Sequence, residues 1–105
     1  MFSHVMLGAN DIEESKVFYD ETLLVLGARP GKLSLNHDGH TRYVYFVNNK
    51  NSFIISQPIN NQEASHGNGA TIGFNASSTD MVDEWYQAGK NAGGIDPELC
   101  DPPGV

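Results

Sequence analysis

Histidines are the residue type in this sequence best suited to metal chemistry, and there are four of them. His37 and His40 bracket an Asp38-Gly39 turn, and two imidazoles across a hairpin can bind a metal ion. Imidazoles at such a turn are more often simply solvated, so this metal site is the weaker of the two interpretations. His4 and His66 stand alone in their local sequence, and their chemistry depends on the elements that hold them.

Carboxylates form two clusters, and each cluster lies at the start of a segment in which apolar residues recur at helical spacing. The groups are Asp11, Glu13 and Glu14, and then Asp80, Asp83 and Glu84. The helix macrodipole favours negative charge in a first helical turn. Both clusters are therefore better explained as helix caps than as pairs of catalytic acids and bases.

A glycine run at Gly67, Gly69 and Gly73 has the look of a dinucleotide-binding loop. A phosphate-binding loop of that kind must follow a strand and open a helix, so that the amides of the helix N-terminus meet the phosphate. Here the glycines precede a predicted strand, so we reject a dinucleotide site.

The N-terminal half predicts one strand, one helix and a three-stranded meander. In the strand over 2–8, Val5 and Leu7 face one way while His4 and Met6 face the other. Asp11 followed by Glu14 forms a capping box for a helix that ends at Gly27. Strands are predicted over 33–36, 41–47 and 52–57, with the Asp-Gly dipeptide as a hairpin turn between the first two. This unit is β-α-β-β-β and ends at Pro58, and residues 59–68 form a polar linker.

The second half predicts a strand over 70–76, in which Ile72 and Phe74 face a helix while Thr71 and Gly73 face the opposite side. N-caps for that helix are offered by Ser77, Ser78 and Thr79. Its buried stripe is predicted to be Met81, Val82, Trp85, Tyr86, Gly89 and Ala92. The helix ends at Gly93-Gly94, and the prolines of 95–105 favour a loop.

The two halves match at a constant offset of 67 residues, which sets His4 against Thr71. The other matches are Ala9 with Ala76, Phe18 with Trp85, Tyr19 with Tyr86, Gly27 with Gly94 and Pro30 with Pro97. Two copies of one supersecondary unit explain this, although two unrelated strand-helix units remain an alternative. The counterpart of Gln57 would lie beyond Val105, so we expect the second copy to lack its final strands.

Composition predicts one small globular domain without a nucleic-acid or membrane partner. Six Lys and Arg against thirteen Asp and Glu give 105 residues a formal charge of −7, which repels phosphate backbones and anionic membrane surfaces. The sequence contains neither a secretion signal nor an apolar run long enough to span a membrane, so we expect a cytoplasmic protein. Cys100 has no partner for an internal disulfide and is expected to be a free thiol, an intersubunit disulfide being the less supported alternative.

The sequence resembles the vicinal oxygen chelate superfamily, which includes glyoxalase I, bleomycin-resistance proteins and extradiol dioxygenases. The resemblance rests on "FSHVMLGANDIEESKVFYDETLLVLG", "SFIISQP" and "GNGATIGFNASSTDMVDEWYQAGKNAGG". It implies an α+β fold in which tandem β-α-β-β-β modules curl their sheets into a cup. We therefore expect one glyoxalase-like domain over 1–105, with a first module at 1–58, a linker at 59–68 and a second module at 69–105 that lacks its final strands.

The resemblance also implies one divalent metal, such as Ni, Zn, Mn or Fe, held in the cup. His4 matches the first ligand position, whereas Ile55 or Gln57 occupies the second and Thr71 the third. The fourth position lies beyond Val105. His66 is a less supported substitute ligand, and a pocket-lining His4 without any metal is the favoured alternative.

One parity of the meander strands is expected to line a pocket for a small, partly apolar ligand. The candidate pocket residues are Met6, Arg42, Tyr43, Tyr45, Phe53, Ile55, Gln57 and Thr71. Packing of the aromatic members in the core is the alternative.

Three functions follow from the resemblance. The first is a metal-dependent lyase or dioxygenase-like enzyme with a degenerate metal site, acting on a small oxygen-rich substrate. The second is a non-catalytic binding protein of the antibiotic-sequestering type, and the third is an inactive relative. We also expect a homodimer, because a partner would cover surfaces that an incomplete second module leaves open.

Overall fold

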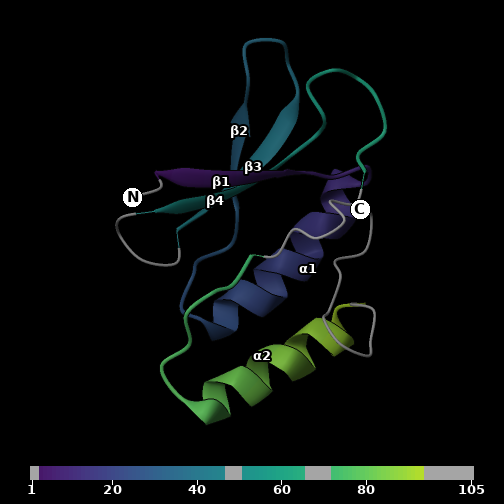
Figure 1. The fold of residues 1–105 in the computed structure, drawn as a ribbon. Helices are drawn as coiled ribbons and strands as arrows, with labels where there is room; N and C mark the ends of the chain where they lie inside the picture. The colour runs from purple at the N-terminus through teal and green to yellow at the C-terminus, as the bar shows by residue number, and fades with distance from the viewer. Residues whose placement is uncertain (1–2, 47–50, 66–71, 94–105) are drawn as a thin grey trace.

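The computed structural model describes residues 3–46, 51–65 and 72–93, and their fold is α+β. The elements follow the order β1 (His4–Gly8), α1 (Ile12–Val25), β2 (Lys32–Leu35), β3 (Thr41–Phe46), β4 (Ser52–Ser56) and α2 (Thr79–Asn91). The β-α-β-β-β order predicted for the first module is therefore confirmed (Figure 1).

The four strands form one mixed sheet in the order β1-β4-β3-β2. β1 pairs with β4 in parallel, with His4 opposite Ser52, whereas the other neighbours are antiparallel. The β2–β3 hairpin closes at the predicted Asp38-Gly39 turn, where Gly39 adopts a φ of 84° that L side chains rarely tolerate. From β1 the chain passes through α1 to β2 at the far edge of the sheet, and then returns through β3 to β4, which lies beside β1. Parallel neighbours such as β1 and β4 need a long connection of this kind.

Helix α1 begins and ends where the sequence signals predict. The Asp11 side chain accepts a hydrogen bond from the Glu14 backbone N–H at 3.1 Å, which satisfies one of the free amides of the first turn. At the other end, Gly27 has a φ of 97°, typical of a residue that stops a helix.

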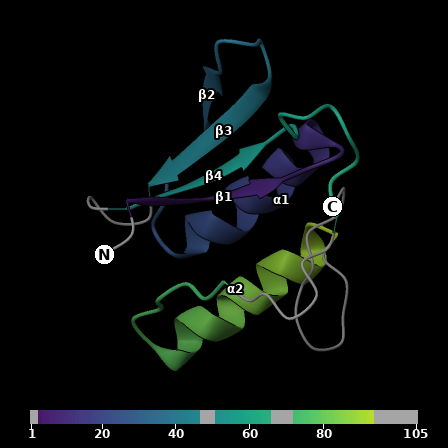
Figure 2. The same cartoon turned by 45° about the horizontal axis from the view of Figure 1, so that its top comes forward.

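The molecule is layered, with the sheet, α1 and α2 stacked in that order (Figures 1 and 2). Both helices lie on the same side of the sheet. Since α1 lies between the sheet and α2, it buries small polar side chains, Ser15 and Thr22, as well as Phe18 and Leu23. None of the helices in the described residues is long and apolar enough to cross a membrane.

An aromatic cluster forms the centre of the core between α1 and the sheet. The rings of Tyr19 and Phe53 lie 4.9 Å apart, and Phe18 packs edge-on against Tyr19 at 5.1 Å. Tyr45 completes the cluster and is 1% exposed. Aromatic pairs of this geometry add stability beyond the area that they bury.

The predicted strand over 70–76 is wrong for its described part, because residues 72–76 form no strand. This segment is held by a side chain instead, since the Phe74 ring packs edge-on against Phe53 at 5.2 Å. A strand needs a partner for its backbone groups, and no neighbouring strand lies beside this segment among the described residues. Thr71, the linker residues 66–68 and the prolines at 97, 102 and 103 lie outside the described residues.

Helix α2 confirms the second helix of the prediction. Of the three N-caps offered by the sequence, Ser78 is used, and its side chain accepts from the Met81 backbone N–H at 3.1 Å. Gly89 is the buried residue of the helix, whereas Val82, expected in the buried stripe, is 49% exposed. The stripe meets α1 rather than a sheet, so only part of it is covered.

Candidate functional site: the open face of the sheet

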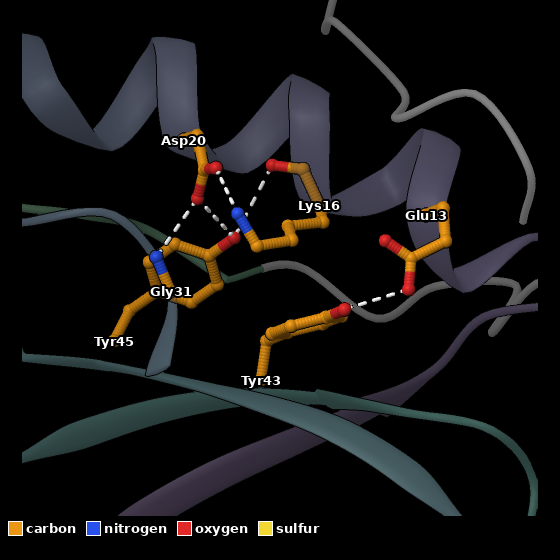
Figure 3. A network of polar contacts seen from close by, with 6 residues as sticks. All are labelled: Glu13, Lys16, Asp20, Gly31, Tyr43 and Tyr45. Atoms are coloured by element: carbon orange, nitrogen blue, oxygen red, sulfur yellow. Dashed lines mark hydrogen bonds and ion pairs between the residues drawn. The ribbon is translucent and has the colours of Figure 1, made fainter. Parts of the chain in front are cut away.

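A network of polar contacts fixes two tyrosines of β3 toward α1 (Figure 3). The Tyr43 hydroxyl donates to Glu13 Oε1 at 2.6 Å, and the Tyr45 hydroxyl donates to Asp20 Oδ1 at 2.8 Å. Asp20 also accepts from the Gly31 backbone N–H at 2.8 Å and pairs with the Lys16 ammonium. These bonds hold both phenols between the layers.

The same surroundings keep both phenols protonated. The hydrogen bond to Glu13, followed by burial, raises the pKa of Tyr43 above its ordinary value. Burial, followed by the hydrogen bond to Asp20, raises the pKa of Tyr45 well above its ordinary value. Neither tyrosine is therefore poised to exchange a proton near neutral pH.

Four residues predicted to line the pocket lie in the core instead. Tyr43, Tyr45, Phe53 and Ile55 are between 1% and 8% exposed. The sheet register sets Val5 opposite Phe53 and Leu7 opposite Ile55, so this parity of β1, β3 and β4 lies on the side of α1. These four residues pack in the core, which was the alternative to a pocket. Any pocket on the sheet must therefore be lined by the residues that alternate with them and face the opposite side.

The other parity forms an open face, because neither helix of the described residues covers that side of the sheet (Figures 1 and 2). Met6, Ile54 and Val44 form one continuous row across β1, β4 and β3. Met6 is 46% exposed and Phe46 is 57% exposed. We define the open face by nine residues of this parity, which are His4, Met6, Lys32, Ser34, Arg42, Val44, Phe46, Ser52 and Ile54. Gly8, which has no side chain, and Ser56, which is 3% exposed, share this parity but are not counted in the open face.

The charged groups of the open face are all basic. Arg42 donates from Nε to Ser34 Oγ at 3.2 Å, which orients its guanidinium. Neither Arg42 nor Lys32 forms an ion pair among the described residues. In a chain of net charge −7, the nine residues of the open face include no Asp or Glu. This surface therefore favours an anion although the chain as a whole is acidic.

His4, the predicted metal ligand, lies on the open face at the end of β1. Its Nδ1 is 2.9 Å from Ser3 Oγ, and the side chain is exposed. A tightly held divalent metal needs three or more protein ligands, and the described residues contain no group of three His, Cys, Asp or Glu side chains that could hold one. These residues do not fit the metal that the resemblance implies. His66, Thr71 and Cys100 lie outside the described residues.

The hairpin histidines do not act as a pair. His37 is exposed, and its Nε2 lies 3.9 Å from Asp38 Oδ2. His40 instead contacts two asparagines, with Nδ1 at 3.3 Å from Asn36 Nδ2 and Nε2 at 2.8 Å from Asn61 Oδ1. Both ring nitrogens of His40 are thus occupied by hydrogen bonds.

Gln57, also predicted to line a pocket, lines a different hollow from the expected cup. This hollow has a volume of about 470 Å³ and lies where β4 runs into the segment after Pro58, with His40 and Asn61 in its wall. Sequence reasoning treated residues 59–68 only as a linker. The available signal was the Asn60-Asn61 pair after Pro58, because asparagine tolerates the positive φ of 61° that Asn61 adopts.

The comparisons with known proteins agree with this fold. The chain belongs to the glyoxalase/bleomycin resistance protein/dioxygenase superfamily, whose family model matches residues 1–103. The suspected membership in the vicinal oxygen chelate superfamily is thereby confirmed. Members of this superfamily commonly bind a divalent metal and are commonly dimers that bind small molecules.

Three solved structures are similar to the chain. A glyoxalase/bleomycin resistance protein from Albidiferax ferrireducens T118 is 46% identical, with a TM-score of 0.82 over 94% of this chain and 75% of that one. A possible glyoxalase from Bacillus cereus is 18% identical, with a TM-score of 0.61 over 90% of this chain and 76% of that one. A lactoylglutathione lyase from Agrobacterium tumefaciens is 17% identical, with a TM-score of 0.52 over 90% and 72%. The last two show the fold alone, and a comparison with curated proteins found no match.

Proposed function

We propose that this protein binds a small, partly apolar anion on its open face, as a non-catalytic binding member of its superfamily. The observation that carries the proposal is the pairing of an exposed apolar row with basic groups on one uncovered sheet face. Since the described residues offer one of the metal ligands that the resemblance implies, we derive no catalytic step through a metal.

The apolar row supports the hydrophobic half of the ligand. Met6 and Phe46 are about half exposed, and Val44 and Ile54 lie beside them. Contiguous apolar surface on a soluble protein marks a binding site more often than chance would give. An aromatic or branched aliphatic group laid across β1, β4 and β3 would cover this row.

Arg42 supports the anionic half. A guanidinium offers parallel N–H donors that match a carboxylate or sulfonate, and its bond to Ser34 fixes the plane in which it presents them. His4 and Lys32 flank the apolar row on the two edge strands. An anion on this face would meet the cationic side chains of Arg42 and Lys32, and none of the nine residues carries a carboxylate.

Two fluorescent probes test the proposal directly. Anilinonaphthalene sulfonate carries the sulfonate and the apolar rings, whereas N-phenylnaphthylamine carries the same rings without the charge. We expect saturable binding of both, with the sulfonate tighter. The Arg42→Gln variant should weaken the sulfonate by about tenfold, because a hydrogen bond to a charged group contributes about 1.5 kcal/mol. It should leave the uncharged probe unchanged.

Arg29→Gln is the matched control, because Arg29 is exposed but is not a residue of the open face. A second pair tests the apolar half, with Phe46→Ser on the open face against Val17→Ser on α1, whose exposures are both 57%. If Arg42→Gln and Arg29→Gln had the same effect, or Val17→Ser weakened binding more than Phe46→Ser, the open face would not be the binding surface.

We further propose a homodimer. Its support is the common dimeric state of the superfamily, together with exposed leucines on α1 and β2, namely Leu24, Leu33 and Leu35. Sedimentation velocity at micromolar concentration tests it, and a single species with the mass of one chain would contradict it.

A further inference from the structure

The hollow of about 470 Å³ beside Gln57 is a second concave surface of the molecule. It shares no residue with the open face, and its volume lies in the range of small-molecule sites. Its lining includes the apolar residues Ala9 and Pro58 as well as amide and carboxylate side chains.

Two amides in this wall are held in one orientation by their oxygens. Gln57 Oε1 accepts from the Thr41 backbone N–H at 2.8 Å, and Asn61 Oδ1 accepts from His40 Nε2 at 2.8 Å. The amide nitrogens of Gln57 and Asn61 have no hydrogen-bond partner among the described residues. Because both residues line the hollow, each has two N–H donors to offer a ligand there, with little side-chain entropy left to lose on binding.

A chain of hydrogen bonds fixes the orientation of Asn61. Asn36 Oδ1 accepts from the backbone N–H groups of Asp38 and His40, each at 2.9 Å. The Asn36 amide nitrogen must then face His40 Nδ1, which acts as the acceptor at 3.3 Å. His40 consequently carries its proton on Nε2 and donates it to Asn61.

The backbone at Asn61 adopts a left-handed conformation that is uncommon for residues other than glycine. Its φ of 61° is the one positive value of a non-glycine residue among those described. A turn in which the Asn61 N–H donates to the Pro58 carbonyl at 3.1 Å holds this conformation. This turn and the hydrogen bond to His40 together fix the position of the Asn61 side chain.

Glu63 provides a hydrogen-bond acceptor at the same hollow. Glu63 is exposed, lines the hollow and forms no ion pair among the described residues. The Asn10 amide also lines the hollow, but both of its ends are bonded to the Ala64 backbone, at 2.6 Å and 3.2 Å, so it has fewer groups to offer a ligand than Gln57 or Asn61. The hollow thus offers two fixed amide donors and one free carboxylate.

We propose that this hollow binds a small zwitterion that carries both a carboxylate and an ammonium group. The carboxylate accepts from the Gln57 and Asn61 amides, and the ammonium donates to Glu63. A zwitterion has no net charge, so the acidic chain does not repel it, whereas a simple anion would face Glu63 directly. A short apolar substituent fits against Ala9 and Pro58.

Nuclear magnetic resonance of the side-chain amide groups tests this with L-alanine as the probe. We expect saturable shifts of the Gln57 and Asn61 side-chain NH₂ signals, with an affinity in the millimolar range typical of a small polar ligand. Lactate lacks the ammonium and ethylamine lacks the carboxylate, so each should bind at least tenfold more weakly.

Variants with matched controls complete the test. Glu63→Gln should weaken alanine at least tenfold and remove its preference over lactate, whereas Glu21→Gln, an exposed position on α1, should change nothing. Asn61→Gly keeps the positive φ and removes one donor, so it should weaken binding while the protein stays folded. The proposal is overturned if neither NH₂ signal shifts saturably, if lactate matches alanine, or if Glu63→Gln binds as tightly as the parent.

Discussion

Gly31 is predicted to be a position that accepts no side chain. A Cβ built there would lie 2.6 Å from Tyr45 Cζ and 2.7 Å from its hydroxyl oxygen, closer than such atoms approach in real proteins. In Gly31→Ala the Tyr45 ring must therefore move, although it is 1% exposed and packed among other rings. The movement would pull its hydroxyl away from Asp20, now 2.8 Å distant.

The size of the effect follows from these two consequences. Losing a buried hydrogen bond to a carboxylate costs about 1.5 kcal/mol, and forcing a ring out of a packed core costs about another 1.5 kcal/mol. The total of about 3 kcal/mol corresponds to a melting temperature lower by about 12 °C in a domain of this size. Urea unfolding followed by tryptophan fluorescence and a thermal scan by circular dichroism both measure it.

Gly73→Ala is the control, because a Cβ at Gly73 meets nothing within 4 Å and its φ is not positive. Its free energy of unfolding should stay within about 0.5 kcal/mol of the parent. If Gly31→Ala were as stable as Gly73→Ala, the close approach of Gly31 to Tyr45 could not be a constraint on the fold, and the reasoning from Figure 3 would fail.

Three further predictions concern Tyr45, the N-cap of α1 and the two faces of the sheet. The pKa of Tyr45 is raised in the folded state, so its protonated phenol stabilises the fold fully below about pH 10, and this stabilisation is lost at higher pH as Tyr45 of the unfolded chain ionises. Between pH 9 and 11 the free energy of unfolding, measured with urea, should therefore fall by about 1.4 kcal/mol more in the parent than in Tyr45→Phe. Equal losses would show that Tyr45 ionises as readily folded as unfolded. Asp11→Ala removes the N-cap of α1 and should lower the free energy of unfolding by about 1 kcal/mol, whereas Asp38→Ala, in an exposed turn, serves as the control and should lower it by less. Phe53→Ala should lower the free energy of unfolding by at least about 3 kcal/mol, because Phe53 is buried against Tyr19, Tyr45 and Phe74. Phe46→Ala should lower it by under about 1 kcal/mol, because Phe46 is 57% exposed on the other face. Similar values for the two variants would contradict the assignment of the two faces.

The first module could be predicted from sequence because its signals are local. Asp11 with Glu14, Gly27 and the Asp38-Gly39 turn each determine a boundary by backbone chemistry that acts within a few residues. The order of elements follows directly from those boundaries.

The face of the sheet that meets α1 could not be predicted in the same way. On β3, Tyr43 and Tyr45 alternate with Val44 and Phe46, and on β4 the neighbours of Ile54 are also apolar. Both parities are therefore apolar, and periodicity alone cannot choose between them. The choice is made in three dimensions, where the tyrosine hydroxyls reach Glu13 and Asp20 on the helix.

The prediction of a strand over 70–76 was wrong because strand formation also depends on contacts that local sequence does not determine. Residues 72–76 have suitable alternation, but a strand forms only where another strand can pair with it. The hollow beside Asn61 was missed because its parts come from the hairpin, the end of β4 and the following segment, which are adjacent only in the folded chain.

The central claim is that the open face of the sheet binds the ligand. The most direct measurement is a set of nuclear Overhauser contacts between bound anilinonaphthalene sulfonate and the side-chain methyl groups of the protein. We predict contacts from the aromatic protons of the probe to Met6, Val44 and Ile54, which form the row across β1, β3 and β4. Contacts confined to Val17 and Leu24 of α1, or to Leu33 and Leu35 of β2, would contradict the claim.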